Sequence, residues 1–358
     1  IADEPTTALD VTIQEQVLKL IRDLTQSRQL AVLLITHDMG VVRNTADEVA
    51  VMYRGEIIEQ AAVDDFFHNP KQEYSRRLID ALPDLTHFQS VAVEEPLLRL
   101  EDVKVHFPIR KGVLQRVVDY TRAVDGVSLS IGRGETYALV GESGSGKSTL
   151  GRAILNLEEI SGGEIHFKGD AIGSLARREM LPYRKLIQVI FQNPFSSMNP
   201  RMTVGEIISE GMVSLGMGLS GEEREERIGL LLDRVQLRRE YSQRYPHEFS
   251  GGQLQRIAIA RALAVEPELI VCDEPTSALD VSIRAEVLGL LQELQREFGV
   301  SYLFITHDLS IVPSLAHHVG VMQAGKLVEQ GSAEQILTAP QHPYTRALLD
   351  SVPRLDPA

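Results

Sequence analysis

Residues 141–149 combine glycines, a lysine and hydroxyl side chains at a spacing suited to binding phosphate. They read Gly-Glu-Ser-Gly-Ser-Gly-Lys-Ser-Thr and fit the pattern G-x-x-x-x-G-K-[ST]. In such a loop the glycines let backbone N–H groups converge on phosphate oxygens at a helix N-terminus. Lys147 adds a positive charge on the outer phosphates, and the Ser148 hydroxyl is a ligand for Mg²⁺. The sequence therefore predicts a phosphate site with a magnesium ion beside it.

Two neighbouring carboxylates follow an apolar run further along the chain. Residues 269–272 are Leu-Ile-Val-Cys, and Asp273 and Glu274 come directly after them. Ligands of open α/β sheets bind at the carboxyl ends of strands, so both side chains are expected there. We expect Asp273 to hold Mg²⁺ and Glu274 to activate water. The competing interpretation is a surface acidic pair that caps the next helix.

Strands and helices must hold these residues in place. Short apolar runs bounded by glycine, asparagine or charge predict buried parallel strands at residues 137–140, 186–191, 269–272 and 302–305. Apolar residues recur on one helical face of residues 281–298, and residues 97–107 alternate as an edge strand does. Strands that alternate with helices indicate an α/β domain.

Three further elements follow in a fixed order. Gln192 comes after the strand expected at 186–191, Ser250-Gly251-Gly252-Gln253 precedes a helix, and His307 ends the strand expected at 302–305. With these motifs the chain resembles the ATP-binding domains of ABC proteins over essentially its whole length. The resemblance implies a P-loop NTPase fold: an ABC-type ATPase domain with a parallel-sheet core, an antiparallel edge sheet and a helical subdomain.

The resemblance also implies a role for each matching residue. The catalytic residues are Glu274 as the carboxylate, His307 as the switch histidine and Gln192 as the Q-loop glutamine. The Mg²⁺ ligands are Ser148, Gln192 and Asp273. The residues expected to bind ATP, from the adenine-stacking position to the D-loop, are Phe107, Gly141, Ser143, Gly144, Ser145, Gly146, Lys147, Ser148, Thr149, Ser250, Gly251, Gly252, Gln253 and Asp280.

The resemblance implies that the signature at residues 249–253 acts in trans. In the family it closes over ATP held by a partner domain, so catalysis needs two domains.

The residue that stacks on adenine has two candidates. Phe107 is followed by an insertion of about ten residues, roughly 108–118, which makes Tyr120 a rival for stacking on adenine. The alternative to a stacking role is an aromatic residue of the edge strand that packs in the core.

The sequence contains a long internal repeat. Residues 1–85 match residues 271–355 at a constant offset of 270 without a gap, and about 33 of the 85 aligned positions are identical. The first copy carries counterparts of Asp273, Glu274, Asp280 and His307 at Asp3, Glu4, Asp10 and His37. We interpret it as the C-terminal part of a second domain of the same type.

The repeat predicts the domain organisation. We expect a remnant of the first ABC ATPase domain at 1–85, a linker at 86–96, a complete second ATPase domain at 97–339 and a tail at 340–358. Ile1 aligns with Val271 inside a strand, so we expect the chain to be truncated at its N-terminus. We then expect it to bind Mg-ATP but to hydrolyse it slowly unless two copies pair.

The sequences of two segments narrow the resemblance to one group of ABC importers. Residues 193–201 and the tail at 340–349 resemble the oligopeptide, dipeptide and nickel importer ATPases, and two such domains in one chain resemble the fused double ATPases of glutathione- and microcin-type importers. The implied function is ATP hydrolysis that powers import of peptides or related small solutes. The implied partners are two integral membrane permease subunits, an extracytoplasmic solute-binding protein and a second ATPase domain. Peptide, glutathione and nickel all remain open as cargo.

Composition limits the alternatives. The formal net charge of −14 over 358 residues argues against a nucleic-acid partner, which needs a basic face. The single cysteine, Cys272, indicates a reducing compartment, and no apolar run of about 18 residues occurs. These observations predict a cytoplasmic chain whose membrane role, if it has one, is peripheral. The resemblance to importer ATPases implies a place on the cytoplasmic face of the inner membrane. The alternative, a soluble tandem ABC ATPase of translation or DNA repair, typically has a long charged inter-domain helix or zinc-binding cysteines.

Overall fold

The computed structural model describes residues 1–5, 11–36, 38–80, 88, 95–111, 116–277 and 279–350. Its strands are β1 (Ala2–Asp3), β2 (Leu34–Ile35), β3 (Glu48–Tyr53), β4 (Glu56–Ala62), β5 (Pro96–Lys111), β6 (Arg116–Gly132), β7 (Thr136–Val140), β8 (Gly162–Phe167), β9 (Asp170–Ala171), β10 (Ile187–Ile190), β11 (Leu269–Asp273), β12 (Ser301–Thr306), β13 (His318–Gln323) and β14 (Lys326–Ser332). Its α-helices are α1 (Val11–Arg28), α2 (Met39–Thr45), α3 (Val63–His68), α4 (Glu73–Asp80), α5 (Lys147–Ile154), α6 (Leu181–Leu186), α7 (Val204–Ser214), α8 (Gly221–Arg234), α9 (Gly251–Leu263), α10 (Val281–Phe298), α11 (Val312–Leu315), α12 (Ala333–Thr338) and α13 (Pro343–Asp350).

A six-stranded sheet forms the centre of the larger part of the chain. Its strand order is β10-β11-β12-β7-β13-β14, and every pair is parallel except the antiparallel pair of β13 and β14. All residues of β7 and β12 are buried, which explains why their sequences are continuous apolar runs rather than alternating ones. The four strands predicted from those runs are confirmed within a residue or two at their ends.

The edge strand expected at residues 97–107 belongs to a second, antiparallel sheet. This sheet has the order β6-β5-β8-β9, and β5 and β6 pair from Pro96–Gly132 out to Lys111–Arg116. The described residues of the insertion expected after Phe107, 108–111 and 116–118, therefore extend both strands of this hairpin. Its inner part is buried through residues such as Leu98 and Ile131, whereas its outer end is exposed.

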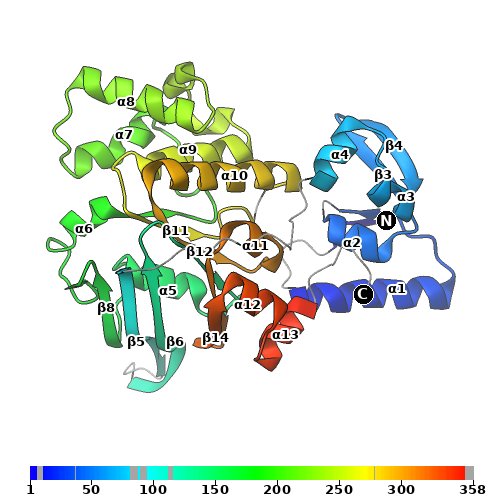
Figure 1. Ribbon diagram of the computed structural model, residues 1–358, viewed down its shortest axis with the longest axis horizontal. Helices are drawn as coiled ribbons and strands as arrows, with labels where there is room; N and C mark the ends of the chain where they lie inside the picture. The colour runs from blue at the N-terminus through cyan, green and yellow to red at the C-terminus, as the bar shows by residue number, and fades with distance from the viewer. Residues whose placement is uncertain are drawn as a thin grey trace.

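Helices α7, α8 and α9 form a separate helical region that lies to one side of the sheet (Figure 1). All three begin with a reciprocal capping box, made by Thr203 with Glu206, by Ser220 with Glu223 and by Ser250 with Gln253. Their apolar faces pack with α10 and with β10 and β11 in one core, which includes Ile207, Leu232 and Ile257. The α/β architecture with an antiparallel sheet and a helical subdomain is confirmed.

The internal repeat is present in the structure as well as in the sequence. Helices α1 and α10 are related by the offset of 270, as are the strand pairs β3–β4 and β13–β14 and the helix pairs α3–α4 and α12–α13. Both hairpins carry a bulge at the same place, after Val51 and after Val321. The first copy occupies the side of the molecule beyond the end of α10, with α4 next to that helix (Figure 1).

Much of the expected linker at 86–96 lies outside the described residues. Phe88 is described and is packed against the cluster that contains Val319 and Leu348, and β5 begins at Pro96. Within the described residues, no helix has the length and apolar character needed to cross a membrane. Because much of the expected linker is not described, the predicted domain boundaries stay a prediction.

Candidate nucleotide-binding site

The phosphate loop joins β7 to α5 in a shape that its glycines make possible. Gly146 is the N-cap of α5 with φ of 105°, a left-handed conformation that L side chains rarely adopt. A side chain at this position would also collide with the backbone oxygen of Ala123 on β6. At the start of the loop, a side chain on Gly141 would collide with the backbone oxygen of Met322 on β13. The loop is therefore held between the two sheets.

Lys147 is a buried cation supported by backbone oxygens. Its Nζ donates to the carbonyl oxygens of Gly141 at 2.7 Å and Glu142 at 2.8 Å, and to the Ser145 hydroxyl at 3.3 Å. Burial lowers the pKa of its ammonium group, although the carboxylates of Glu274 and Asp273 oppose that shift. Partial negative charges on neutral oxygens compensate a buried ammonium group only in part, so the geometry suits an anionic ligand.

Ser148 and Asp273 form the oxygen pair expected for a hard cation. The Ser148 hydroxyl donates to Asp273 Oδ1 at 2.7 Å, joining the first turn of α5 to the end of β11. Burial raises the pKa of the Asp273 carboxyl group; the Ser148 hydroxyl opposes the shift and the neighbouring Glu274 adds to it. Carboxylate and hydroxyl oxygens are ligands that Mg²⁺ prefers, so these residues fit that ion.

Gln192 and His307 both contact the carboxylate of Glu274. Gln192 Nε2 donates to Glu274 Oε2 at 2.9 Å, and His307 Nδ1 lies 3.2 Å from Glu274 Oε1. The contact with His307 lowers the pKa of Glu274, and the contact with Glu274 raises the pKa of His307 against the effect of burial. The structure thus brings together the three residues predicted to be catalytic.

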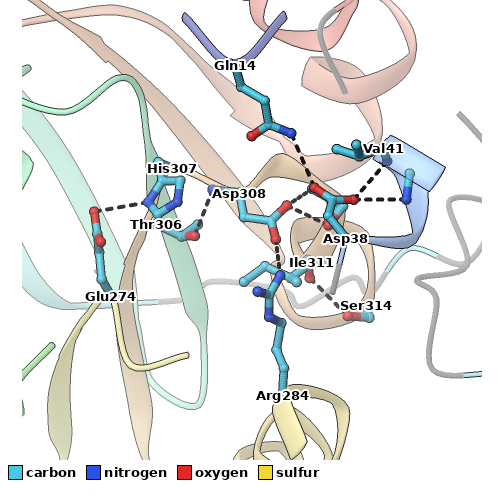
Figure 2. Close-up of polar contacts among 12 residues, drawn as sticks. Gln14, Asp38, Val41, Glu274, Arg284, Thr306, His307, Asp308, Ile311 and Ser314 are labelled. Carbon is cyan, nitrogen blue, oxygen red and sulfur yellow. Dashed lines mark hydrogen bonds and ion pairs between the residues drawn. The ribbon is translucent and has the colours of Figure 1, made fainter. Parts of the chain in front are cut away.

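Neighbouring strands place this cluster. Glu274 follows β11 and His307 follows β12, and the Glu274 N–H donates to the Ile305 carbonyl at 3.0 Å. Glu274 has φ of 47°, a left-handed backbone conformation that is uncommon for residues other than glycine. Figure 2 shows Glu274 and His307 facing each other.

The turn after His307 is fixed by a second charged pair. The Asp308 N–H donates to the Thr306 hydroxyl at 3.0 Å, and Asp308 Oδ1 accepts from the Ser310 N–H at 2.9 Å. Arg284 of α10 donates to Asp308 Oδ2 at 2.6 Å (Figure 2). Sequence reasoning did not single out Arg284 or Asp308, because neither belongs to a motif whose chemistry the spacing reveals.

The signature residues form the N-terminus of α9. Ser250 and Gln253 make a reciprocal capping box, in which the Ser250 N–H donates to Gln253 Oε1 at 3.0 Å. Gly251 is exposed and Gly252 is buried against Ile283 of α10, where an added Cβ would lie only 2.5 Å from the Ile283 side chain. Asp280, at the N-cap of α10, is exposed one turn before that contact.

The two candidates for adenine stacking lie on the outer part of the β5–β6 hairpin. Phe107 pairs with Thr121 and Tyr120 pairs with Pro108, and both aromatic rings are exposed. Because consecutive register positions of a strand pair alternate between faces, the two rings project from opposite faces of the hairpin. Only one of the two rings can therefore face a nucleotide bound on one side of the hairpin. Which ring stacks on adenine stays a prediction.

The first copy of the repeat keeps part of the same arrangement. Glu4 has φ of 43°, as its counterpart Glu274 has 47°, and its N–H donates to the Ile35 carbonyl at 2.8 Å. Asp3 ends β1 as Asp273 ends β11. Gln14 Nε2 donates to Asp38 at 3.3 Å, matching the Arg284–Asp308 contact (Figure 2). The predicted counterparts Asp10 and His37 lie outside the described residues.

Comparison with known proteins agrees with this geometry. The ABC transporter family matches residues 124–277, and the oligopeptide/dipeptide transporter C-terminal region matches residues 58–100 and 328–358. The glutathione import ATP-binding proteins GsiA of Escherichia coli (strain K12) and Salmonella choleraesuis (strain SC-B67) are each 47% identical over 384 residues. These alignments cover 100% of the chain, which spans 62% of the length of each relative.

Two solved structures of similar fold match this chain over nearly the whole of their own length. CbiO1 from Clostridium perfringens, part of the ABC transporter complex cbiONQ, has 31% identity and a TM-score of 0.60, covering 69% of this chain and 92% of its own. The ATP-binding cassette MJ0796, solved as a dimer with ADP and Pi, has 30% identity and a TM-score of 0.59, covering 66% and 98%. On the phosphate loop, the catalytic cluster and these matches, the chain belongs to the ATP-binding cassette family of ABC transporter proteins.

Proposed function

We propose that this chain binds and hydrolyses ATP to power the import of peptides or related small solutes through an ABC transporter. The observation that carries the proposal is the meeting of three groups at the carboxyl ends of β7, β10, β11 and β12. These groups are the buried Lys147 ammonium, the Ser148–Asp273 pair and the Gln192–Glu274–His307 cluster. A site with these three parts has the positioning and charge that phosphoryl transfer requires.

Each part has a distinct task in this proposal. The loop N–H groups and Lys147 hold the phosphates, and Lys147 exchanges its contacts with the Gly141 and Glu142 carbonyls for phosphate oxygens. Glu274 is kept ionised by His307, so its carboxylate can accept a proton from the attacking water. Gln192 and His307 hold the two oxygens of that carboxylate and thereby fix its orientation.

Magnesium and a second ATPase domain complete the site as we propose it. Ser148, Asp273 and Gln192 are the residues that would hold Mg²⁺, which when bound neutralises charge on the phosphates. The signature helix α9 presents exposed Ser250 and Gly251 at its N-terminus, a position suited to an anion. We propose that this end acts on ATP held by another ATPase domain, either the first half of a fused protein or another copy of this chain.

The transported solute is inferred from the C-terminal segment and the relatives. The oligopeptide/dipeptide C-terminal match falls on both copies of the repeat, and the relatives named above import glutathione. A peptide-sized solute fits both observations. We accordingly propose two integral membrane permease subunits and an extracytoplasmic solute-binding protein as partners, and a peripheral position on the cytoplasmic face of the inner membrane.

Purification of the tagged chain from its native membranes in mild detergent tests this proposal. We expect two integral membrane proteins to co-purify with it, and we expect ATP hydrolysis by the complex to fall when Lys147 is replaced by alanine. The matched control is Lys168→Ala, because Lys168 is a surface lysine paired with Glu268. Recovery of ribosomes or DNA in place of membrane proteins would instead support the translation or repair alternative.

A further inference from the structure

The C-terminal helix α13 reaches the phosphate loop of its own domain. The backbone N–H of Glu142 donates a hydrogen bond of 3.1 Å to the hydroxyl oxygen of Tyr344, a residue more than 200 positions away in the sequence. Tyr344 lies in the first turn of α13, and Glu142 is the second residue of the loop. The segment that matches the oligopeptide/dipeptide transporter C-terminal region thus contacts the phosphate loop directly.

This hydrogen bond restrains the peptide group that also holds Lys147. The peptide bond between Gly141 and Glu142 presents its carbonyl oxygen to Lys147 Nζ at 2.7 Å and its N–H to Tyr344 at 3.1 Å. Rotation of this peptide plane would break both contacts at once. Because Gly141 imposes little conformational restriction of its own, the tyrosine hydroxyl adds a second restraint on this peptide to the one that Lys147 supplies.

A carboxylate anchors the helix that carries Tyr344. Glu329 of β14 accepts hydrogen bonds from the backbone N–H groups of Gln341 at 2.6 Å and His342 at 3.0 Å, just before α13. Leu348 of α13 is buried in the same cluster as Ile336 of α12. The position of Tyr344 is therefore set by a folded segment and not by the phosphate loop.

Among the residues that the structure describes, the first copy of the repeat has the carboxylate that docks the helix but not the tyrosine–loop hydrogen bond. In the first copy Glu59 accepts from the N–H groups of Lys71 at 2.8 Å and Gln72 at 3.0 Å, so the same carboxylate device docks α4. The counterpart of Tyr344 there is Tyr74, whose ring packs on Tyr53 with centroids 4.4 Å apart. The second copy has Gln323 where the first has Tyr53. Docking of the helix therefore does not depend on a tyrosine–loop hydrogen bond.

We propose that Tyr344 is a positioning residue of the nucleotide site, whose hydroxyl holds the Gly141–Glu142 peptide in the orientation that binds Mg-ATP. This inference rests on the proposed function and adds a role for the C-terminal segment within it. Tyr344 acts through the loop and is not itself a catalytic residue. Its effect falls on nucleotide affinity, while the Gln192–Glu274–His307 cluster is left unchanged.

The test compares Tyr344→Phe with Tyr183→Phe in the whole chain. Each variant removes one hydroxyl; that of Tyr183 donates to Asp170 at 2.9 Å on the antiparallel sheet. Three quantities are measured: the Kd for Mg-ATP, the amide exchange rate of a peptide covering residues 141–145, and the thermal unfolding midpoint. The exchange rate of α13 itself shows whether the helix remains docked.

We expect Tyr344→Phe to raise the Kd about three- to ten-fold, as loss of one neutral hydrogen bond implies, and to speed exchange at the loop. Exchange in α13 and the unfolding midpoint should stay at parent values, and Tyr183→Phe should match the parent in every loop measurement. Parent-like Kd or parent-like loop exchange in Tyr344→Phe overturns the inference. If the parent chain itself fails to bind Mg-ATP, the proposed function fails, and the exchange rate still tests the hydrogen bond.

Discussion

Charge at the site is arranged so that no ionised group stands alone. Lys147 is buried with backbone oxygens around its Nζ, Asp273 accepts from Ser148, and Glu274 is held from two sides by Gln192 and His307. Burial of charge is costly unless compensated, so each of these contacts stabilises the folded site before any ligand is present. Replacement of one partner therefore affects ligand binding and local structure together.

Lys147→Ala should weaken Mg-ATP binding strongly. The ammonium group supplies the only cationic side chain that the described part of the phosphate loop offers, and hydrogen bonds to charged groups contribute about 1.5–3 kcal/mol each. We expect Kd to rise at least about ten-fold in equilibrium titration. Lys168→Ala serves as the control and should bind like the parent. Unchanged affinity in Lys147→Ala would remove the lysine from the assigned role.

Individual residues differ in how well the sequence revealed them. Lys147, Asp273 and Glu274 could be predicted because Lys147 opens a helix after a glycine-rich loop, and the two carboxylates stand at the end of a strand, where open α/β sheets bind their ligands. Tyr344 could not, since its contact with Glu142 spans the chain and depends on how α13 docks. The choice between Phe107 and Tyr120 also depends on tertiary placement, because both occur in an alternating hairpin.

Whole elements, in contrast, were largely predictable, and the repeat explains why. The helix expected at residues 281–298 is α10 with the same bounds, and its counterpart α1 ends 270 residues earlier at Arg28. The sequence periodicity that specifies one copy specifies the other. The extended β5–β6 hairpin was not foreseen, since residues 108–118 have little apolar alternation; residues 108–111 and 116–118 gain their strand structure by pairing.

The carboxylate that docks α13 should be sensitive to acid. Burial opposes ionisation of Glu329, but the Thr345 side chain and the N–H groups of Gln341 and His342 outweigh it and lower its pKa. A carboxyl group whose pKa is lowered by folding stabilises the fold above its unfolded pKa, and that contribution is lost as the pH falls through the folded pKa. Docking should thus be strongest near neutral pH.

Glu329→Gln tests this contribution through amide exchange in α13. We expect faster exchange than in the parent at pH 7, a difference that stays constant down to about pH 5 and shrinks below it. Glu59→Gln is the matched variant in the first copy, where the pKa of Glu59 is also lowered, and it should affect α4 alone. A difference that grew on acidification would have the wrong sign for an ionised anchor.

The contact between α9 and α10 should tolerate no added side chain at the signature. In Gly252→Ala the new Cβ would lie 2.5 Å from Cγ2 of Ile283, so the Ile283 side chain or the two helices must shift. We expect a loss of about 1–3 kcal/mol in the free energy of unfolding, as for other overpacked sites. Gly289 lies in α10 at a position where an added Cβ would meet nothing within 4 Å. Gly289→Ala should instead raise the free energy of unfolding by about 0.5–1 kcal/mol.

Denaturant titration of these two glycine variants gives both values on one scale. Because the residues lie in adjacent helices, the comparison separates crowding at the interface from a general effect of alanine in a helix. A Gly252→Ala protein as stable as Gly289→Ala would show that the signature helix is not packed against α10 as described.

At the scale of the whole molecule, the chain combines one cassette with a second copy of its C-terminal third. The two copies share the strained glutamate, the bulged hairpin and the docked tail helix, which indicates that the tail is an integral part of the fold. The sequence predicted this repeat from a constant offset, and the domain boundaries drawn from it stay a prediction. It could not predict that α4 would lie beside α10, because contacts between copies leave no periodic pattern in the sequence.

The most direct test of the account is the rate of phosphate release from Mg-ATP by the parent and by Glu274→Gln at equal concentration and saturating nucleotide. Gln keeps the size of the side chain and an oxygen for Gln192, but it cannot accept a proton from water. We predict parent-like Kd and a hydrolysis rate at least about 100-fold lower. Hydrolysis at the parent rate by Glu274→Gln would contradict the assignment of Glu274 as the group that activates water.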